Sequence, residues 1–167
     1  MYNRLTQKDV ERIQEEIDHR KVELRKELID AVKEARAQGD LSENFEYYAA
    51  KREKNQNEGR IRYLERMLKT AEIVDDSSEE GVVGMNNKVE IYFEDDDETD
   101  VYKIVTPVRC DTLKNKISIE SPIGKAIFGH KVGERVMVHV NENYSFPVVI
   151  RSIEGIEDEE EDEIRKY

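Results

Sequence analysis

The sequence predicts an α+β protein, in which a long antiparallel helical hairpin is followed by a small twisted β-sheet domain with one short helix. Apolar residues recur every three or four positions through residues 1–74, the period of a helix face, and alternate with polar residues from residue 88 onward, the period of a strand. Charge divides the chain at the same place. Residues 1–74 contain equal numbers of basic and acidic side chains, so the whole net charge of −12 falls on residues 75–167. The chain therefore consists of two small modules of different construction.

The first arm of the hairpin is predicted for residues 8–38, a stretch without Gly or Pro and rich in helix-forming residues. Its apolar residues form a narrow stripe of coiled-coil type on one face: Val10, Ile13, Ile17, Leu24, Leu28, Val32 and Ala35. Gly39 follows directly and suits the left-handed conformation in which many helices end.

The second arm is predicted for residues 43–73, with a matching apolar face of Tyr47, Ala50, Ile61, Leu64, Leu68 and Ala71. Two helices of about 30 residues with so short a connection must lie antiparallel, so that residues whose numbers add up to about 81 face each other. This register pairs Leu64 with Ile17. Each arm would be ~45 Å long, and we expect the hairpin to project. Residues 51–60 contain no apolar side chain, so we expect its middle to be weakly packed.

The second domain is predicted for residues 88–156, after a linker at residues 75–87 that is rich in Asp, Ser, Gly and Asn. Short runs with strand-like patterns occur at residues 89–93, 101–105, 116–119, 135–140 and 147–153. After the third run, Ser121 as N-cap, a proline at the first helical position and Gly129 at the far end indicate one short helix. An acidic tail is expected at residues 157–167.

The turn between the arms carries two carboxylates that local chemistry explains in two ways. Asp40 is a good N-cap for the second arm, and Glu43 stands three residues later, where the carboxylate of a capping box belongs. The same two carboxylates could share a divalent cation, because Mg²⁺ needs few protein oxygens and keeps several waters. From these residues alone, both interpretations stay open.

The turn and the residues after it also resemble a known family. The run from Gln38 to Asn44, followed by Glu46-Tyr47 and Ala49-Ala50, is similar to the hairpin tip of the GreA/GreB transcript-cleavage factors of bacterial RNA polymerase. Residues of the second domain resemble the same family: Ser121-Pro122-Ile123-Gly124, Gly129 and Val132-Gly133. The resemblance extends over residues 5–155 and implies an FKBP-like second domain that docks on the polymerase.

The resemblance implies a transcription elongation factor that is not an enzyme by itself. The hairpin would enter the secondary channel of RNA polymerase, where the 3′ end of a backtracked nascent RNA is extruded, and stimulate endonucleolytic cleavage of that RNA. Asp40 and Glu43 occupy the positions of the family's catalytic carboxylates. There they would help the polymerase to hold a second Mg²⁺ and to orient a water, so the free protein is not expected to bind this Mg²⁺ tightly.

The resemblance also implies contact surfaces. A basic patch on the flank of the hairpin would bind RNA: Lys51, Arg52, Lys54 and Arg60. Polymerase contacts are expected from Asn44, Phe45, Tyr47, Ser121, Pro122 and Ile123. The alternatives are that the basic residues belong to a solvated helix face paired with nearby acids, and that one of Tyr47 and Tyr48 packs inside the hairpin. Phe45 departs from the family, which usually has a small alanine at this position.

Other functions fit the sequence less well. The nearest alternative is a paralogue of the same fold that enters the channel and inhibits or modulates the polymerase without cleavage. A dimerising scaffold would need a second apolar stripe on the outer helix faces, and a nuclease would need acids clustered with a histidine; the sequence has neither. The net charge of −12 disfavours direct DNA binding, so any such binding would be weak or indirect.

Composition favours a cytoplasmic, monomeric protein. No stretch approaches the ~20 apolar residues of a membrane span, and the N-terminus has no apolar signal region. The single cysteine, Cys110, excludes an internal disulfide framework and suits a reducing compartment.

Overall fold

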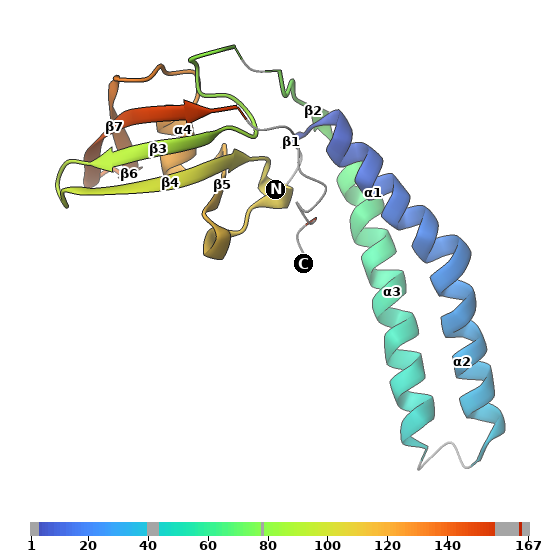
Figure 1. The fold of residues 1–167 in the computed structure, drawn as a ribbon. Coiled ribbons are helices and arrows are strands. Elements are labelled where there is room, and N and C mark those ends of the chain that lie inside the picture. The colour runs from blue at the N-terminus through green and yellow to red at the C-terminus, as the bar shows by residue number, and fades with distance from the viewer. Residues whose placement is uncertain (1–3, 40–43, 78, 156–163, 165–167) are drawn as a thin grey trace. The chain divides into compact units, whose positions relative to one another are not determined.

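The computed structural model describes residues 4–39, 44–77, 79–155 and 164. The described chain forms two compact units (Figure 1). The first consists of residues 7–71, and the second consists of residues 4–6 together with the chain from residue 72 onward.

The first unit is the predicted helical hairpin. One arm comprises α1 (Gln7–His19), a π-helical turn η1 (Arg20–Leu24) and α2 (Arg25–Ala37), and the other arm is α3 (Phe45–Lys69). Figure 1 shows α3 running antiparallel beside α1 and α2. The seam between the arms buries Met67, which the predicted stripe did not contain, and six residues of the two stripes: Ile13, Ile17, Ala35, Tyr47, Ile61 and Leu64. Periodicity alone was therefore sufficient to predict the hairpin.

The predicted length of the second arm is wrong at its C-terminal end. Helix α3 ends at Lys69, where the N–H of Thr70 bonds to the carbonyls of Arg66 and Leu68. Glu72–Ile73, predicted to be helical, forms the short strand β2, which pairs in parallel with β1 (Arg4–Leu5). The N–H of Val74 also donates to the carbonyl of Leu5, at 2.8 Å. Pairing with a distant segment thus satisfies the backbone groups that a longer helix would have used.

The second unit contains a five-stranded sheet with the order β5-β4-β3-β7-β6. Its strands are β3 (Lys88–Phe93), β4 (Glu98–Val105), β5 (Lys116–Ser118), β6 (Arg135–Asn141) and β7 (Tyr144–Glu154). All neighbours are antiparallel except β4 and β5. Two short 3-10 turns, η2 (Pro107–Arg109) and η3 (Thr112–Lys114), precede β5, and the helix α4 (Pro122–Ile127) follows it. All five predicted strands and the short helix are confirmed.

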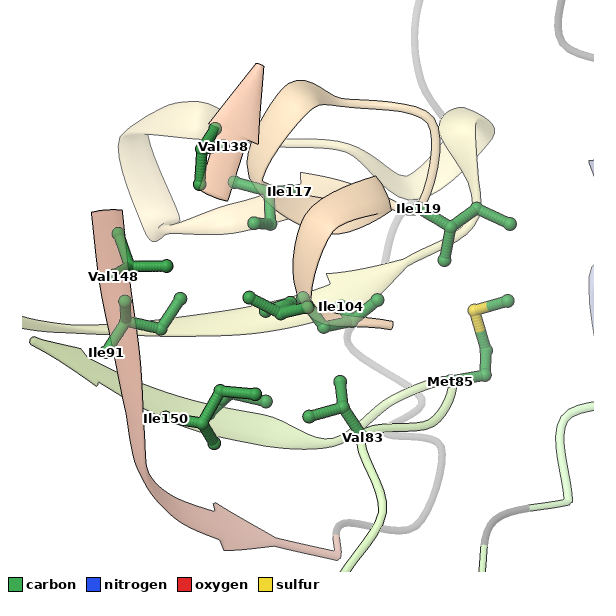
Figure 2. Close-up of a cluster of buried hydrophobic side chains, with 11 residues drawn as sticks. Val83, Met85, Ile91, Ile104, Ile117, Ile119, Val138, Val148 and Ile150 are labelled. Atoms are coloured by element: carbon green, nitrogen blue, oxygen red, sulfur yellow. The ribbon is translucent and has the colours of Figure 1, made fainter. Parts of the chain in front are cut away.

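The core of this unit lies between the sheet and α4 (Figure 2). It includes Val83 and Met85, which the sequence analysis placed in a linker at residues 75–87. That assignment is wrong for the second half of the stretch. The N–H of Asn86 donates to the carbonyl of Ile104 at 2.7 Å, and the N–H of Ile104 donates to the carbonyl of Asn87 at 3.0 Å. These bonds to β4 bring the two isolated apolar residues into the core.

Candidate functional site

The end of the hairpin is the candidate site. Asp40 and Glu43, the predicted catalytic and Mg²⁺-binding carboxylates, lie outside the described residues. Their roles therefore stay predictions. The residues on both sides of them are described, and these show how the ends of the two arms are held.

Asn44 connects the two arms with one side chain. Its Oδ1 accepts a hydrogen bond from the N–H of Tyr47 at 3.1 Å, which makes Asn44 the N-cap of α3. Its Nδ2 donates to the carbonyl of Ala35 in the last turn of α2, at 2.7 Å. Of the two interpretations left open for Asp40, the role of N-cap of α3 is excluded, because Asn44 has that role and the helix begins at Phe45. Asn44 was predicted as a polymerase contact, and the structure uses its amide within the hairpin.

The aromatic residues after the cap divide into buried and exposed ones. Tyr47 is only 9% exposed, and its hydroxyl accepts a hydrogen bond from Nη2 of Arg36 at 3.3 Å. This bond lowers the pKa of Tyr47. Phe45 is 87% exposed and Tyr48 is 49% exposed. Of the predicted contact residues, Phe45 therefore presents an apolar surface, whereas Tyr47 belongs to the packing of the hairpin.

Three of the predicted basic residues lie on α3 beyond the aromatics. Lys51 and Arg52 are exposed and Lys54 is half-buried. None of the three forms an ion pair with any residue that the structure describes. Glu58, which the alternative interpretation paired with this patch, instead accepts two hydrogen bonds from Arg25 on the other arm, at 2.7 and 3.0 Å. The charges of the patch are thus directed to solvent or to a ligand.

Beside these cations, the surface of α3 is hollowed. The hollow is lined by Tyr48, Lys51, Arg52, Asn55 and Gln56. An exposed aromatic ring next to two cations is an arrangement that can hold a single-stranded nucleic acid, because the ring stacks on a base while the cations contact phosphates.

Arg60, the fourth predicted RNA-binding residue, does not belong to this patch. It is only 7% exposed, and its Nε and Nη2 donate to the carboxylate of Glu16 at 2.9 and 3.2 Å. Its guanidinium also lies over the ring of Tyr63, 5.5 Å from the centroid. The prediction is wrong because Arg60 points into the interface between the arms. The predicted register places Arg60 opposite Lys21, five residues from Glu16, so it did not reveal this pair.

In the second unit, the predicted polymerase contacts lie at the start of α4. The Ser121 hydroxyl accepts from the N–H of Gly124 at 3.0 Å and donates to the carbonyl of Ser118 at 2.6 Å. The predicted N-cap is therefore confirmed. A Cβ atom on Gly124 would lie 2.1 Å from the Ser118 oxygen, so only glycine fits there. Pro122 is exposed, and Ile123 packs against the core. Ser121 and Gly124 thus have roles in the local structure of α4. Of the three predicted contact residues here, Pro122 is the one exposed at the surface.

The described residues show neither a metal-binding cluster nor a membrane-spanning helix. No group of three or more His, Cys, Asp or Glu side chains among them is arranged to hold a metal ion. No helix in that part of the chain is both long and apolar enough to cross a bilayer.

Comparison with known proteins decides the family. Residues 3–73 match the family model described as "Transcription elongation factor, N-terminal", and residues 78–155 match "Transcription elongation factor, GreA/GreB, C-term". The chain belongs to the GreA/GreB family. Transcription elongation factor GreA of Thermoanaerobacter pseudethanolicus is 44% identical over 137 residues, which are 81% of this chain and 87% of the relative. GreA of Caldanaerobacter subterraneus subsp. tengcongensis is 43% identical over equal shares of the two chains.

A solved structure of the transcription factor Gfh1 has 29% sequence identity to this chain and a TM-score of 0.46, covering 93% of this chain and 99% of that one. The two matches to the GreA/GreB family fall on the hairpin and on the sheet domain respectively. In this GreA/GreB-family chain, the described end of the hairpin presents Phe45, Tyr48 and three cations. It uses Asn44 and Tyr47 for its own structure, and Arg60 pairs with Glu16 in the middle of the hairpin.

Proposed function

We propose that this factor inserts its hairpin into the secondary channel of RNA polymerase and stimulates endonucleolytic cleavage of backtracked RNA, which rescues arrested complexes. The polymerase supplies the active site, and the factor supplies two carboxylates. Membership of the GreA/GreB family and the 44% identity to a GreA support this role.

The observation that carries the proposal is the capping of α3 by Asn44. The two carboxylates of the turn had a competing explanation as a helix cap and a capping box. Since α3 begins at Phe45 with Asn44 as its cap, capping no longer explains why Asp40 and Glu43 are acidic. We propose instead that both carboxylates act on a ligand.

The carboxylates fit a magnesium ion by their chemistry. Mg²⁺ prefers oxygen ligands and is often held by one or two carboxylates with several waters retained. Two carboxylates alone make a weak site, so Asp40 and Glu43 would hold the ion together with ligands of the polymerase. When bound, such an ion supplies charge stabilisation for the displacement at phosphorus. The residues of this chain contribute by holding it and by orienting the attacking water.

The flank of α3 would guide the extruded RNA. Lys51, Arg52 and Lys54 are free to contact phosphates, and Tyr48 is exposed enough to stack on a base. Arg60 is not part of this surface, because Glu16 holds it inside the hairpin. The proposed RNA contact therefore extends over the half of α3 nearest the turn.

A cleavage assay on a stalled, backtracked elongation complex tests the proposal. The intact chain should shorten the transcript from its 3′ end, whereas Asp40→Asn and Glu43→Gln should bind the polymerase normally and lose stimulated cleavage by orders of magnitude. High Mg²⁺ should restore part of the loss. Cleavage at near wild-type rate by the stable, bound variants would refute the role of the carboxylates. Polymerase inhibition without cleavage by the intact chain would identify the non-cleaving paralogue instead.

A further inference from the structure

The first arm of the hairpin contains a π turn at its middle. Between α1 and α2, residues Arg20–Leu24 are π-helical, and the N–H of Arg25 donates to the carbonyl of Arg20, five residues earlier. A π turn holds one residue more than an α turn, is rare, and occurs mostly as a single turn inserted in a helix, often at a functional site. Its presence in an otherwise regular arm needs a cause.

The π turn determines which face of α2 meets α3. If these residues were α-helical, every residue after the turn would take the place of its C-terminal neighbour, a rotation of about 100° with a shift of ~1.5 Å. Ile13 and Ile17 before the turn and Ala35 after it are all buried in the same seam. The extra residue is directed outward, since Val22 within the turn is 71% exposed. The π turn thus determines which residues of α2 face α3, and Ala35 is the residue of α2 that the observed rotation buries.

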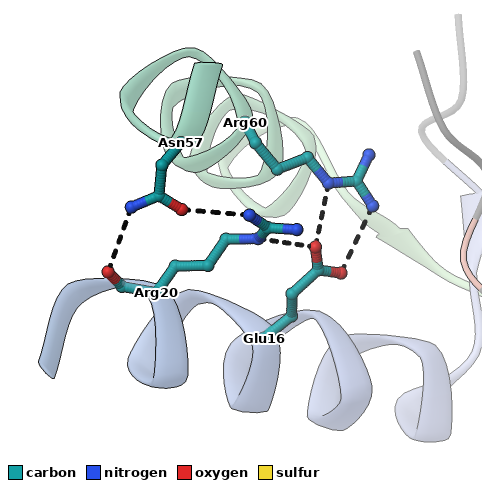
Figure 3. A network of polar contacts seen from close by, with 4 residues as sticks. All are labelled: Glu16, Arg20, Asn57 and Arg60. Carbon is teal, nitrogen blue, oxygen red and sulfur yellow. Dashed lines mark hydrogen bonds and ion pairs between the residues drawn. The ribbon is translucent and has the colours of Figure 1, made fainter. Parts of the chain in front are cut away.

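Asn57 on α3 contacts the first residue of this turn in two ways (Figure 3). Its Nδ2 donates to the backbone carbonyl of Arg20 at 3.3 Å, and its Oδ1 accepts from Nη1 of Arg20 at 3.0 Å. Asn57 is only 3% exposed, and Nε of Arg20 donates to Glu16 at 2.8 Å. The carbonyl of Arg20 therefore accepts two hydrogen bonds, one from Arg25 across the π turn and one from the opposite arm.

We propose that Asn57 is a positioning residue: its amide bond to the Arg20 carbonyl holds the π turn and so sets the rotation of α2 against α3. A buried amide in a coiled coil is known to fix the register of the helices at some cost in stability. The same rotation presents the carbonyl of Ala35 to Asn44, so the middle of the hairpin positions the two ends that flank the turn. The effect on cleavage rests on the proposed function, whereas the effect on register does not.

The alternative is that the apolar stripe sets the register and that Asn57 only fills its place. Two variants separate these possibilities. Asn57→Leu removes both hydrogen bonds and keeps the branching of the side chain, and Asn57→Asp keeps an acceptor for the Arg20 guanidinium but removes the donor to the carbonyl. Gln14→Leu is the matched control, because it removes an exposed amide of the same hairpin that donates only within α1, to Asp18.

The register can be measured with cysteine pairs in the full chain carrying Cys110→Ser. Ala31 and Ala50 line the same surface hollow, so a pair at these positions reports the observed register. A pair at Asp30 and Ala50 reports the shifted one, because Asp30 would take the place of Ala31 if the turn became α-helical. Oxidation yields of the two pairs, and the scalar coupling through the hydrogen bond from Arg25 to Arg20, provide two independent readouts.

We expect both Asn57 variants to lower the ratio of the 31–50 disulfide to the 30–50 disulfide by about fivefold or more, as for the loss of one buried hydrogen bond. The Arg25–Arg20 coupling should weaken with it, and Gln14→Leu should change neither. An unchanged ratio in both variants would overturn the proposal. A change in Asn57→Leu alone would also overturn it, since the guanidinium bond would then suffice. If Asn57→Leu does not fold, Asn57→Asp decides.

The rate of stimulated cleavage provides a second, separate test. A shifted register should lower stimulated cleavage in the Asn57 variants while polymerase binding persists, and Gln14→Leu should leave both cleavage and binding unchanged. If the unmodified chain stimulates no cleavage, the proposed function fails while the disulfide ratios still decide the role of Asn57. If cleavage is normal in variants whose register has shifted, the link from the π turn to the hairpin end is refuted.

Discussion

Glu16 on α1 and Arg60 on α3 form a two-point ion pair between the arms of the hairpin, with Nε and Nη2 of Arg60 at 2.9 and 3.2 Å from the two carboxylate oxygens. Together with Arg20 and Asn57 they make the middle of the hairpin a satisfied polar network (Figure 3). The absence of apolar side chains from residues 51–60 predicted a weakly packed middle. The finding replaces that expectation with a polar contact that is buried and specific.

Removing Arg60 should therefore destabilise the protein. Arg60→Ala leaves the Glu16 carboxylate with Arg20 as its remaining partner, and we expect a loss of ~1–3 kcal/mol in the free energy of unfolding, measured by urea titration. Arg62→Ala, at an exposed neighbouring position, should change it by less than ~0.5 kcal/mol. Equal effects of the two substitutions would contradict the assignment of Arg60 to the packing of the hairpin.

The same pair should make stability depend on pH. Burial raises the pKa of Glu16, but the hydrogen bonds and charges of Arg60 and Arg20 outweigh it, so the net pKa lies below its ordinary value of 4.5. A lowered pKa in the folded state stabilises the fold above the ordinary pKa, and this contribution is lost as the pH falls through the folded-state value. The stability difference between the wild type and Glu16→Gln should thus be constant near neutral pH and shrink below pH 4.5. A stability difference that grows on acidification would contradict the lowered pKa of Glu16.

The capping assignment at the hairpin end predicts a contrast between two neighbours. Asn44→Ala should cost about 1 kcal/mol or more of stability, because it removes the cap of α3 and the bond to Ala35. Asp40→Ala should cost little, because Asn44 is the N-cap of α3. Thermal unfolding of the two variants side by side measures the contrast. A larger loss for Asp40→Ala would return the capping role to that residue.

Gly124 offers a test of the second domain. A Cβ at this position would lie 2.1 Å from the backbone oxygen of Ser118, so Gly124→Ala should destabilise the chain by ~2–3 kcal/mol through overpacking. Gly129 has a φ of +80° but open space around it, so Gly129→Ala should cost only the ~1–2 kcal/mol of a left-handed alanine. Melting temperatures that fall more for Gly129→Ala would contradict the close approach at α4.

The basic flank predicts an effect of RNA length and of salt. Lys51→Glu combined with Arg52→Glu should reduce cleavage of transcripts with long extruded 3′ ends more than of those with short ends, because only the long ends reach the flank. Raising the salt concentration should narrow the gap, since phosphate contacts are screened. An equal reduction for both transcripts would assign the two residues to polymerase binding or to folding.

The sequence predicted those features that periodicity encodes. The apolar stripe containing Ile13 and Ile17 predicted the first arm, and the alternation around Val89 and Ile91 predicted a strand of the sheet. Ser121 predicted the start of α4, because Ser followed by Pro is a local signal that needs no distant partner. Each of these features depends on residues close together in the chain.

The features that were missed depend on distant partners or on a choice between equivalent residues. Strand β2 exists through its pairing with Arg4 and Leu5, which no local pattern reveals. Asp40 and Asn44 are equally good caps by local rules, and only the end of α2 decides between them. Arginine side chains are mostly exposed, so the sequence alone favoured an exposed Arg60. Its burial depends on Glu16, which lies opposite it on the other arm. The π turn leaves no mark in the spacing of Ile17 and Leu24, which are seven residues apart as in a regular helix.

The double bonding of Asn44 has a consequence for how the hairpin end can evolve. Bringing the two ends of a loop together costs conformational entropy. Asn44, at the edge of the turn, offsets part of this cost because its side chain bonds to both arms. The connection between the arms at this end thus rests on a residue outside positions 40–43. Selection can alter their acidity or size while the supporting helices stay unchanged. A single hairpin scaffold can then give rise to factors with different chemistry, each a few substitutions away from the next.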